Sequence, residues 1–404
     1  MQLASRQLYN PQSLWLLTGL ASHMGQIIGL HREGSLRGLS PFETEMRRRL
    51  WSQILILDSR SAQLSGATID SQLHLFWDTK RPLNVNDSDL SQSMRELPSE
   101  HDGLTEMLFC CIRFEIGDCM RGLKSLGQSG GASIVQQERA VDELENRLDK
   151  RFLKKCDPSI PLHLLATYLV RSSICSMRLS VHHPRQQSDE GAGVSQKQKD
   201  VLFALALQVI VYDNLAYSTK SLEGYLWHVA VYFGFEAFIL LLTELITRVE
   251  GEAVDRAWAE IGLVYDNHPG LILESRNALY YAIGNLTLKA WDRRVSAARE
   301  HQPPYLLPES PFTSRLRAKR IAKSQPTSQT SYPDAIRSSV QASQDRHDDN
   351  HQAGLNSLEM TASVDFPMDT ADWDWGCWQS LLDGRGDPFF AEREQHPGVD
   401  MNNH

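Results

Sequence analysis

Apolar side chains recur at intervals of three and four residues through most of the first 300 positions, which is the spacing of one face of an α-helix. No segment shows the sustained alternation of apolar and polar residues that is typical of a half-buried strand. The spacing predicts helices over residues 11–28, 40–66, 104–126, 133–152, 161–179, 198–219, 224–249, 253–266 and 276–299. The fold class that follows is all-α.

Local signals mark where some of these helices begin and where they are interrupted. Asn10 can cap a helix that starts at Pro11, and Ser40-Pro41-Phe42-Glu43 is a capping box with proline at the first helical position. Residues 77–90 contain Pro82, two Asn and three Asp, which favour an ordered loop. Residues 184–195 are polar and are expected to form a mobile insert.

One apolar stretch, residues 224–246, is long enough to cross a membrane. It carries His228, Glu236 and Glu244, which are costly in hydrocarbon. We therefore expect a buried core helix and no membrane partner.

The chemical character changes after Pro308. Residues 1–308 are expected to form the helical body, and residues 309–357, rich in Ser, Gln, Arg and Asp, a disordered linker. The linker opens with a basic run over residues 315–323. This run has three possible interpretations: a nuclear import signal, a nucleic-acid contact or a solvated linker segment. The run consists of Arg315, Arg317, Lys319, Arg320 and Lys323.

Residues 358–404 form an acidic and aromatic tail. Between Asp345 and Asp383 there are nine acidic residues and one Arg. Acidic residues keep neighbouring apolar anchors solvated and available to a partner groove, which is how an acidic-hydrophobic activation segment works. The candidate anchors are Trp373, Trp375, Trp378, Leu381 and Leu382. The alternative is that these residues dock on the helical body as a C-terminal strap.

Charge and cysteine content exclude several kinds of protein. Lys and Arg number 41 against 50 Asp and Glu among 404 residues, a formal charge of −9, so the whole surface is not suited to coating nucleic acid. The six cysteines are scattered and none forms a C-x-x-C pair, which predicts reduced thiols and no zinc site or other cofactor in this chain.

No motif predicts an enzyme. Residues 127–131 match G-x-S-x-G around Ser129, but a nucleophile elbow follows a strand, and the preceding residues have a helical pattern. Residues 84–89 are rich in oxygen ligands yet lack the central Gly and closing Glu of a calcium loop. Asp58 interrupts an apolar run, and a structural ion pair with Arg47 or Arg60 explains it better than catalysis.

Four blocks of the sequence resemble the fungal-specific transcription-factor domain, the helical middle region of six-cysteine zinc-cluster regulators. They are ASHMGQIIGLHREGS (21–35), SPFETEMRRRLWSQILILDSR (40–60), WDTKRPLNVNDSDL (77–90) and LTEMLFCCIRFE (104–115). The resemblance covers about residues 10–300. The positions that carry the family motif, expected to be structural, are Arg48, Arg49, Trp51, Asp58, Pro82, Asn84 and Asp87.

The resemblance implies a nuclear role in controlling transcription by RNA polymerase II, with a biosynthetic or nutrient gene cluster as the target. It also implies a homo- or heterodimer and recruitment of transcription machinery or a co-activator by the tail. A full-length member carries an N-terminal zinc cluster that binds DNA. This chain has none, so no zinc ligand or DNA contact transfers to it, and zinc is expected only in a full-length member.

Three functional hypotheses follow. The chain is a co-regulator that acts on DNA only through partners, or it is the regulatory part of an activator whose zinc cluster is missing from this sequence. The third, an enzyme of helical fold that uses Ser129 as a hydrolase nucleophile, is the weakest because the motif lacks its strand.

Overall fold

The computed structural model describes residues 11–65, 77–128, 133–182, 195–274, 277–300 and 306–324. Over these ranges the regular secondary structure is helical, with α-helices joined by short 3-10 turns and no strand. The all-α fold class is therefore confirmed. The helical periodicity of the sequence is the local cause, since each long helix buries one apolar face.

The N-terminal helices are α1 (Pro11–Ile27), α2 (Pro41–Ser65), α3 (Leu108–Gln128), α4 (Ile134–Arg151) and α5 (Pro161–His182). The C-terminal ones are α6 (Gln196–Ser218), α7 (Leu226–Val229), α8 (Phe235–Thr247), α9 (Glu252–Asn267), α10 (Gly270–Leu273), α11 (Ala278–Glu300) and α12 (Pro311–Ser324). Among the described 3-10 turns the longest, η7, covers Lys220–Tyr225. Eight of the nine sequence-predicted helices are reproduced within a few residues.

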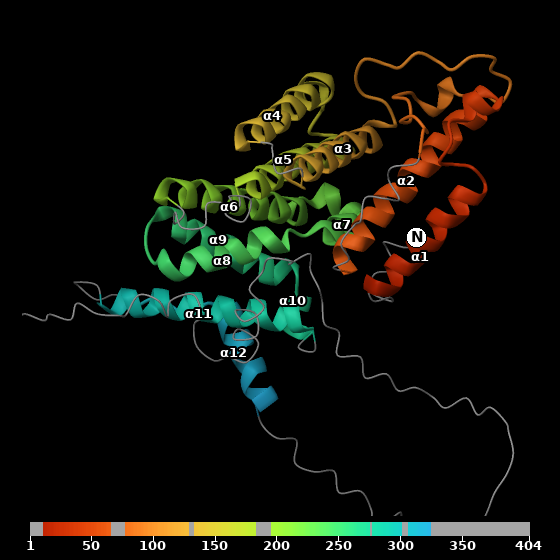
Figure 1. The fold of residues 1–404 in the computed structure, drawn as a ribbon. Helices are drawn as coiled ribbons and strands as arrows, with labels where there is room; N and C mark the ends of the chain where they lie inside the picture. Colours follow the sequence, from red (N-terminus) through yellow and green to blue (C-terminus); the bar gives the residue numbers. More distant parts are fainter. Residues whose placement is uncertain are drawn as a thin grey trace, which may run out of the picture.

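The helices stack in layers, with α4 at one end, α3 and α5 beneath it, α6 in the middle, then α8 and α9, and finally α11 and α12 (Figure 1). A large hydrophobic core joins α6, α8, α9 and α11, and a second one joins α3, α4 and α5. Helix α6 contributes many fully buried side chains to the large core, Ala206 and Ile210 among them. The pair α1 and α2 lies beside this stack (Figure 1).

Helix α6 is also the one described helix long and apolar enough to cross a membrane, and half of its most apolar window is buried inside the protein. A core helix of a water-soluble protein has the same composition.

The prediction of one helix over residues 224–249 is wrong. The chain runs through η7, α7 and a short 3-10 turn, turns at Phe233 and Gly234, and continues as α8 at an angle of 72°. The bend brings Gly234 against α6, where an added Cβ would lie 2.9 Å from a methyl of Val209. Because only glycine fits against α6 here, this contact fixes the position of the bend before α8.

The prediction of a linker from residue 309 is also wrong over its first part. Residues 311–324 form α12, and Phe312 and Leu316 are buried in the large core. The helical body therefore extends to residue 324. The rest of the predicted linker, residues 184–194 of the predicted insert, and the whole predicted tail lie outside the described residues.

Candidate functional site

The family-motif positions converge where α1, α2 and residues 77–107 meet. Arg48 of α2 is 4 % exposed and forms a two-pronged ion pair with Glu33, with Nη2–Oε1 and Nε–Oε2 distances of 2.5 and 3.2 Å. The Glu33 carboxylate also accepts hydrogen bonds from the Lys80 backbone N–H and the Ser35 hydroxyl, both at 2.9 Å. Burial alone would raise the pKa of Glu33, but these hydrogen bonds outweigh it and lower the pKa to about 2.

The two neighbouring arginines hold other segments. Arg47 donates to the carbonyl of Ile28 at the end of α1, at 2.9 Å. Arg49 donates to Glu45 at 3.2 Å and to Asp87 at 2.6 Å, which ties residues 77–90 to α2. The three consecutive arginines thus connect α2 to three different segments.

Glu45 is fully buried one turn before Arg49. Its Oε1 accepts the Leu83 backbone N–H at 3.1 Å, whereas its Oε2 has no hydrogen-bond partner among the described residues. Burial raises the pKa of Glu45, although the Leu83 N–H and Arg49 act in the opposite direction. The pKa of the buried Glu45 is therefore raised, whereas that of the buried Glu33 in the same network is lowered.

Trp51 supplies the apolar centre of this region and is 2 % exposed. Its ring neighbours those of His31 and Trp77, with centroids 6.1 and 6.2 Å away. Gly25 of α1 packs directly on it, since a Cβ there would lie 3.0 Å from the indole ring. Glycine at this position allows α1 and α2 to approach closely.

Asn84 fastens the ordered loop to the segment before α3. Its side-chain amide donates to the carbonyls of His101 and Gly103 at 2.9 and 2.8 Å, and its Oδ1 accepts the Thr105 hydroxyl at 2.7 Å. Pro82 is also buried. Asn84, and likewise Asp87 with Arg49 and Asp89 with His101, are thus engaged by groups of this chain, which accounts for the oxygen-rich residues that suggest a calcium loop.

Asp58 accepts a hydrogen bond from the Thr18 hydroxyl of α1 at 2.9 Å. The arginines expected to pair with it point elsewhere: Arg47 to Ile28, and Arg60 to the carbonyl of Val231. The predicted ion pair of Asp58 with Arg47 or Arg60 is therefore wrong, and Asp58 instead accepts the Thr18 hydroxyl, which joins α2 to α1.

We call this set of contacts the N-terminal clamp. It consists of Arg47, Arg48, Arg49, Trp51, Asp58, Asn84 and Asp87 with the partners named above. Most of its polar groups are satisfied by other groups of the same chain, so the clamp serves to hold α1, α2 and residues 77–107 in one arrangement.

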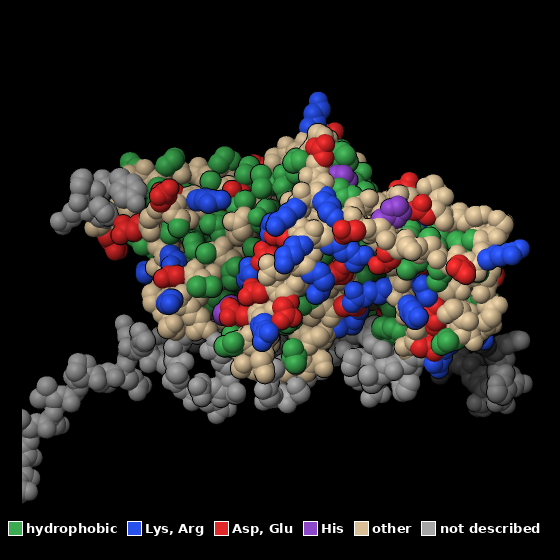
Figure 2. Space-filling view, turned by 90° about the horizontal axis from the view of Figure 1, so that it is seen from above, with side chains coloured by type: hydrophobic (Ala, Val, Ile, Leu, Met, Phe, Trp, Pro, Cys, Tyr) green, Lys and Arg blue, Asp and Glu red, His purple; other side chains and the backbone are tan. Residues whose placement is uncertain are grey.

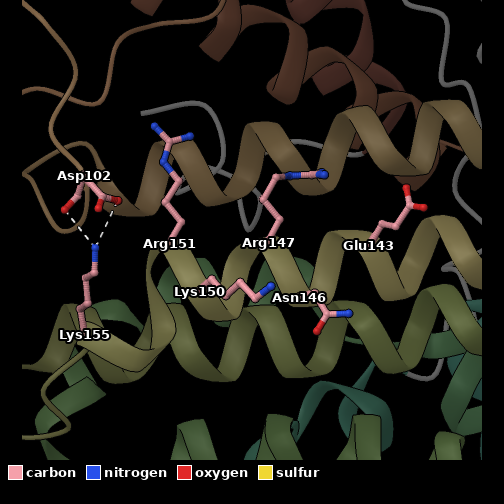
Figure 3. A pocket seen from close by; sticks show the side chains of 7 residues that line it. All are labelled: Asp102, Glu143, Asn146, Arg147, Lys150, Arg151 and Lys155. Atoms are coloured by element: carbon pink, nitrogen blue, oxygen red, sulfur yellow. Dashed lines mark hydrogen bonds and ion pairs between the residues drawn. The ribbon is translucent and has the colours of Figure 1, made fainter.

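A groove of about 990 Å³ opens beside α4, lined by Asp102, Glu143, Asn146, Arg147, Lys150, Arg151 and Lys155 (Figure 3). Four cations and two carboxylates give the lining an excess of positive charge. Figure 2 shows Lys and Arg side chains gathered near the middle of the face that α4 contributes to.

Part of that positive charge is compensated. Arg147 and Arg151 both contact the buried Glu115, at 2.7 and 3.4 Å, and Lys155 lies 3.2 Å from Asp102. The groove can attract an anionic surface, but it contains no nucleophile with an adjacent base. The spacing of cations at 147, 150–151 and 154–155 is a sequence signal that the motif analysis missed.

The described cysteines do not form a metal or redox site. Burial raises the pKa of Cys111 to about 12, and it also raises the pKa values of Cys110 and Cys119, which keeps these thiols protonated. Within the described ranges no three His, Cys, Asp or Glu side chains are placed to hold a metal ion. Cys377 lies outside those ranges.

Ser129 also lies outside the described residues, but the chain before it is α3, which runs through Gln128. A nucleophile elbow needs a strand at that point. The local fold therefore does not support a hydrolase site.

The predicted basic run is placed on α12, where its arginines contact the helical body. Arg315 pairs with Asp266 of α9 at 2.7 Å, Arg317 pairs with Asp292 of α11, and Arg320 donates to Asn285 of α11 at 2.8 Å. Lys319 is exposed, and the side chain of Lys323 is not described. The five candidate anchors Trp373, Trp375, Trp378, Leu381 and Leu382 lie outside the described residues.

Comparison with known proteins gives a consistent family assignment. Residues 1–209 match the fungal specific transcription factor domain. The aurofusarin cluster transcription factor aurR2 of Gibberella zeae is 40% identical over 414 residues, which cover 97% of this chain and 61% of that protein. No solved structure matches.

Two further relatives carry similar names. The pyriculol/pyriculariol biosynthesis cluster transcription factor 1 of Pyricularia oryzae is 28% identical, over 91% of this chain and 51% of its own length. The transcriptional regulator AacuB of Aspergillus aculeatus is 31% identical, over 73% of this chain and 41% of its own. The chain thus spans between about two fifths and three fifths of the length of these three relatives, which are named as transcription regulators and not as enzymes.

Proposed function

Because this chain belongs to the fungal specific transcription factor domain family, we propose that it is the regulatory part of a transcription regulator for a biosynthetic gene cluster. The observation that carries the proposal is the 40% identity with aurR2, since it extends over 97% of this chain and aurR2 is named for the aurofusarin cluster. Nuclear localisation and control of RNA polymerase II transcription belong to the same proposal.

Within this proposal the helical body and the tail have separate roles. The N-terminal clamp joins distant segments into a rigid unit, which suits a scaffold better than a catalyst. The acidic tail would then supply the output by docking its Trp and Leu anchors into a co-activator or the transcription machinery. DNA would be reached through a partner or through a zinc cluster in a longer form of the protein.

The contacts of the α12 arginines argue against the basic run as a nuclear import signal. An import receptor that read the basic run as an extended peptide would have to break the contacts of Arg315, Arg317 and Arg320 with helices α9 and α11. We propose that these arginines mainly fix α12, and that nuclear entry uses another signal or a partner. A fluorescent fusion carrying Lys319→Ala and Lys323→Ala should stay nuclear, and cytoplasmic retention would restore the import assignment.

A reporter assay tests the tail. Residues 340–404 are fused to a heterologous DNA-binding domain, beside a Trp373→Ala/Trp375→Ala/Trp378→Ala version. We expect the fusion with the wild-type tail to activate the reporter, and the triple variant to lose most of this activation. A Phe389→Ala/Phe390→Ala version is the matched control and should remain active. Equal output from the wild-type tail and the triple variant would remove the tail from the proposal.

A further inference from the structure

The groove beside α4 has a cationic middle and a carboxylate at each end. Glu143 lies at one end and Asp102 at the other, and their side chains are 62 % and 92 % exposed (Figure 3). Between them lie three cations and one amide from the last turns of α4. We call this set the α4 cationic centre, and it consists of Asn146, Arg147, Lys150 and Arg151.

A buried carboxylate holds the two arginines of the centre in place. Glu115 of α3 is 4 % exposed, accepts a hydrogen bond from Arg147 Nε at 2.7 Å and lies 3.4 Å from Arg151 Nη1. Among the described residues Arg147 is held through Nε alone, which leaves both of its Nη groups to another partner, and its side chain is 53 % exposed. One carboxylate thus orients two guanidinium groups but carries the charge to neutralise only one.

The remaining charge of the centre is compensated weakly. Lys150 is exposed and forms no ion pair with a described residue. Arg151 also contacts Glu100 at 3.2 Å, but both side chains reach solvent and such a pair contributes little free energy, so an incoming anion can replace it. The carboxyl end of a helix carries partial negative charge, so the side chains must supply the attraction for an anion here.

The arrangement of charges limits the kind of anion that fits. Arg147 and Arg151 are one helical turn apart, about 6 Å along the axis of α4. Beyond this stretch Glu143 and Asp102 would repel a polyanion that runs past either end of the groove (Figure 3). A nucleic-acid strand or a long acidic peptide continues past these carboxylates, whereas a compact anion fits between them.

We propose that the α4 cationic centre binds a small molecule that carries two or three adjacent phosphate groups. The two Nη groups of Arg147 match two oxygens of one phosphate, and the ammonium group of Lys150 adds a point charge for the next. Asn146 can donate its side-chain amide. The groove volume of about 990 Å³ is in the range of small-molecule sites. This inference goes beyond the proposed function and does not depend on it.

Isothermal titration calorimetry of the full chain with inorganic tripolyphosphate tests the inference. We expect saturable binding at one site per chain. Arg147→Ala/Lys150→Ala should weaken binding about tenfold or more, because it removes two of the three cations of the centre. Lys197→Ala/Arg293→Ala is the matched control, since it removes two exposed cations outside the groove and should bind as the wild type does. Circular dichroism should show equal helix content in all three proteins.

Two further measurements separate a shaped site from general attraction between charges. Arg147→Lys keeps the charge but loses the planar fork, so it should bind tripolyphosphate several-fold more weakly than the wild type. A short DNA duplex, titrated at the same salt concentration, should bind the wild type more weakly than tripolyphosphate does.

Several outcomes would overturn the inference. They are no saturable binding of tripolyphosphate, unchanged binding by the double Ala variant or by Arg147→Lys, and an equal loss of binding in the control variant. Tighter binding of the duplex than of tripolyphosphate would overturn it as well, because the groove would then serve a nucleic acid.

Discussion

Burial and hydrogen bonding act on the Glu33 carboxylate in opposite directions. The side chain is 1 % exposed, which alone disfavours its charge, yet it accepts hydrogen bonds from Arg48, Lys80 and Ser35. The hydrogen bonds prevail, so the carboxylate stays ionised beside Arg48. Both side chains of this pair are almost fully buried in the N-terminal clamp, at 4 % and 1 % exposed.

Glu33→Gln should therefore be costly. The variant keeps the size of the side chain but removes the two-pronged counter-ion of the buried Arg48, which leaves only the Glu45 carboxylate 3.8 Å from its guanidinium. Breaking such a buried pair costs about 3–5 kcal/mol in the free energy of unfolding. Denaturation by urea at neutral pH measures it. Glu43→Gln, on the exposed side of the same region, is the matched control and should change stability by less than about 0.5 kcal/mol. A similar small loss for Glu33→Gln would contradict the role assigned to the pair.

The same carboxylate predicts a pH dependence. Its pKa is about 2 in the folded protein against an ordinary 4.5, so the unfolded chain takes up the proton at a higher pH than the folded one. Its stabilisation is complete above about pH 4.5 and is lost as the pH falls toward 2, a change on the order of 3 kcal/mol. The difference in unfolding free energy between the wild type and Glu33→Gln should shrink over this interval. A constant difference would show that the carboxylate does not titrate as described.

At the scale of elements, the sharp turn between η7–α7 and α8 depends on one close contact. Gly234→Ala places a methyl group 2.9 Å from a Val209 methyl, and this overpacking should lower stability by about 1–3 kcal/mol. Gly224→Ala, with no atom within 4 Å of the added Cβ, should be close to neutral. Thermal unfolding compares the two. If both changed the melting temperature equally, crowding against α6 would not be what fixes the bend.

Because α12 packs on the large core, we expect the stability of the helical body to depend on residues beyond 308. Phe312 is 4 % exposed and its ring stacks on Tyr265, with centroids 5.2 Å apart. Phe312→Ala should cost about 3–5 kcal/mol, as for other buried aromatic side chains. Leu306→Ala, at an 89 % exposed position, should have little effect. Urea unfolding measures the free energy of unfolding of both variants. Equally small effects would contradict the assignment of residues 311–324 to the helical body.

The sequence predicts the long helices well because each has a repeating apolar face, and that signal is local. The bend at Gly234 is not local, since it depends on a contact with Val209 of another helix. Helix α12 escapes prediction because Phe312 and Leu316 are too few to stand out among serines and basic residues. Both misses come from tertiary packing that overrides local composition.

The same distinction applies to the candidate site. The motif positions Arg48, Arg49 and Asn84 could be identified from sequence blocks, and their structural role was expected. Their partners could not, because Glu33 lies 15 residues before Arg48, and the groups that Asn84 holds lie 17–21 residues after it. Such pairings depend on how α1, α2 and residues 77–107 fold together.

At the scale of the whole molecule, the chain combines a helical body extending to residue 324 with an acidic, aromatic C-terminal region. The body holds the N-terminal clamp and a partly compensated basic groove.

Transcript measurement in the organism that carries the gene tests the central claim most directly. The gene is deleted and then restored as the wild type or with Trp373→Ala/Trp375→Ala/Trp378→Ala, and transcripts are quantified across the genome. We expect a coordinated fall of one set of clustered biosynthetic genes on deletion, recovery with the wild type and little recovery with the triple variant. Unchanged transcripts of every biosynthetic cluster after deletion, under conditions where the gene is expressed, would contradict the proposed function.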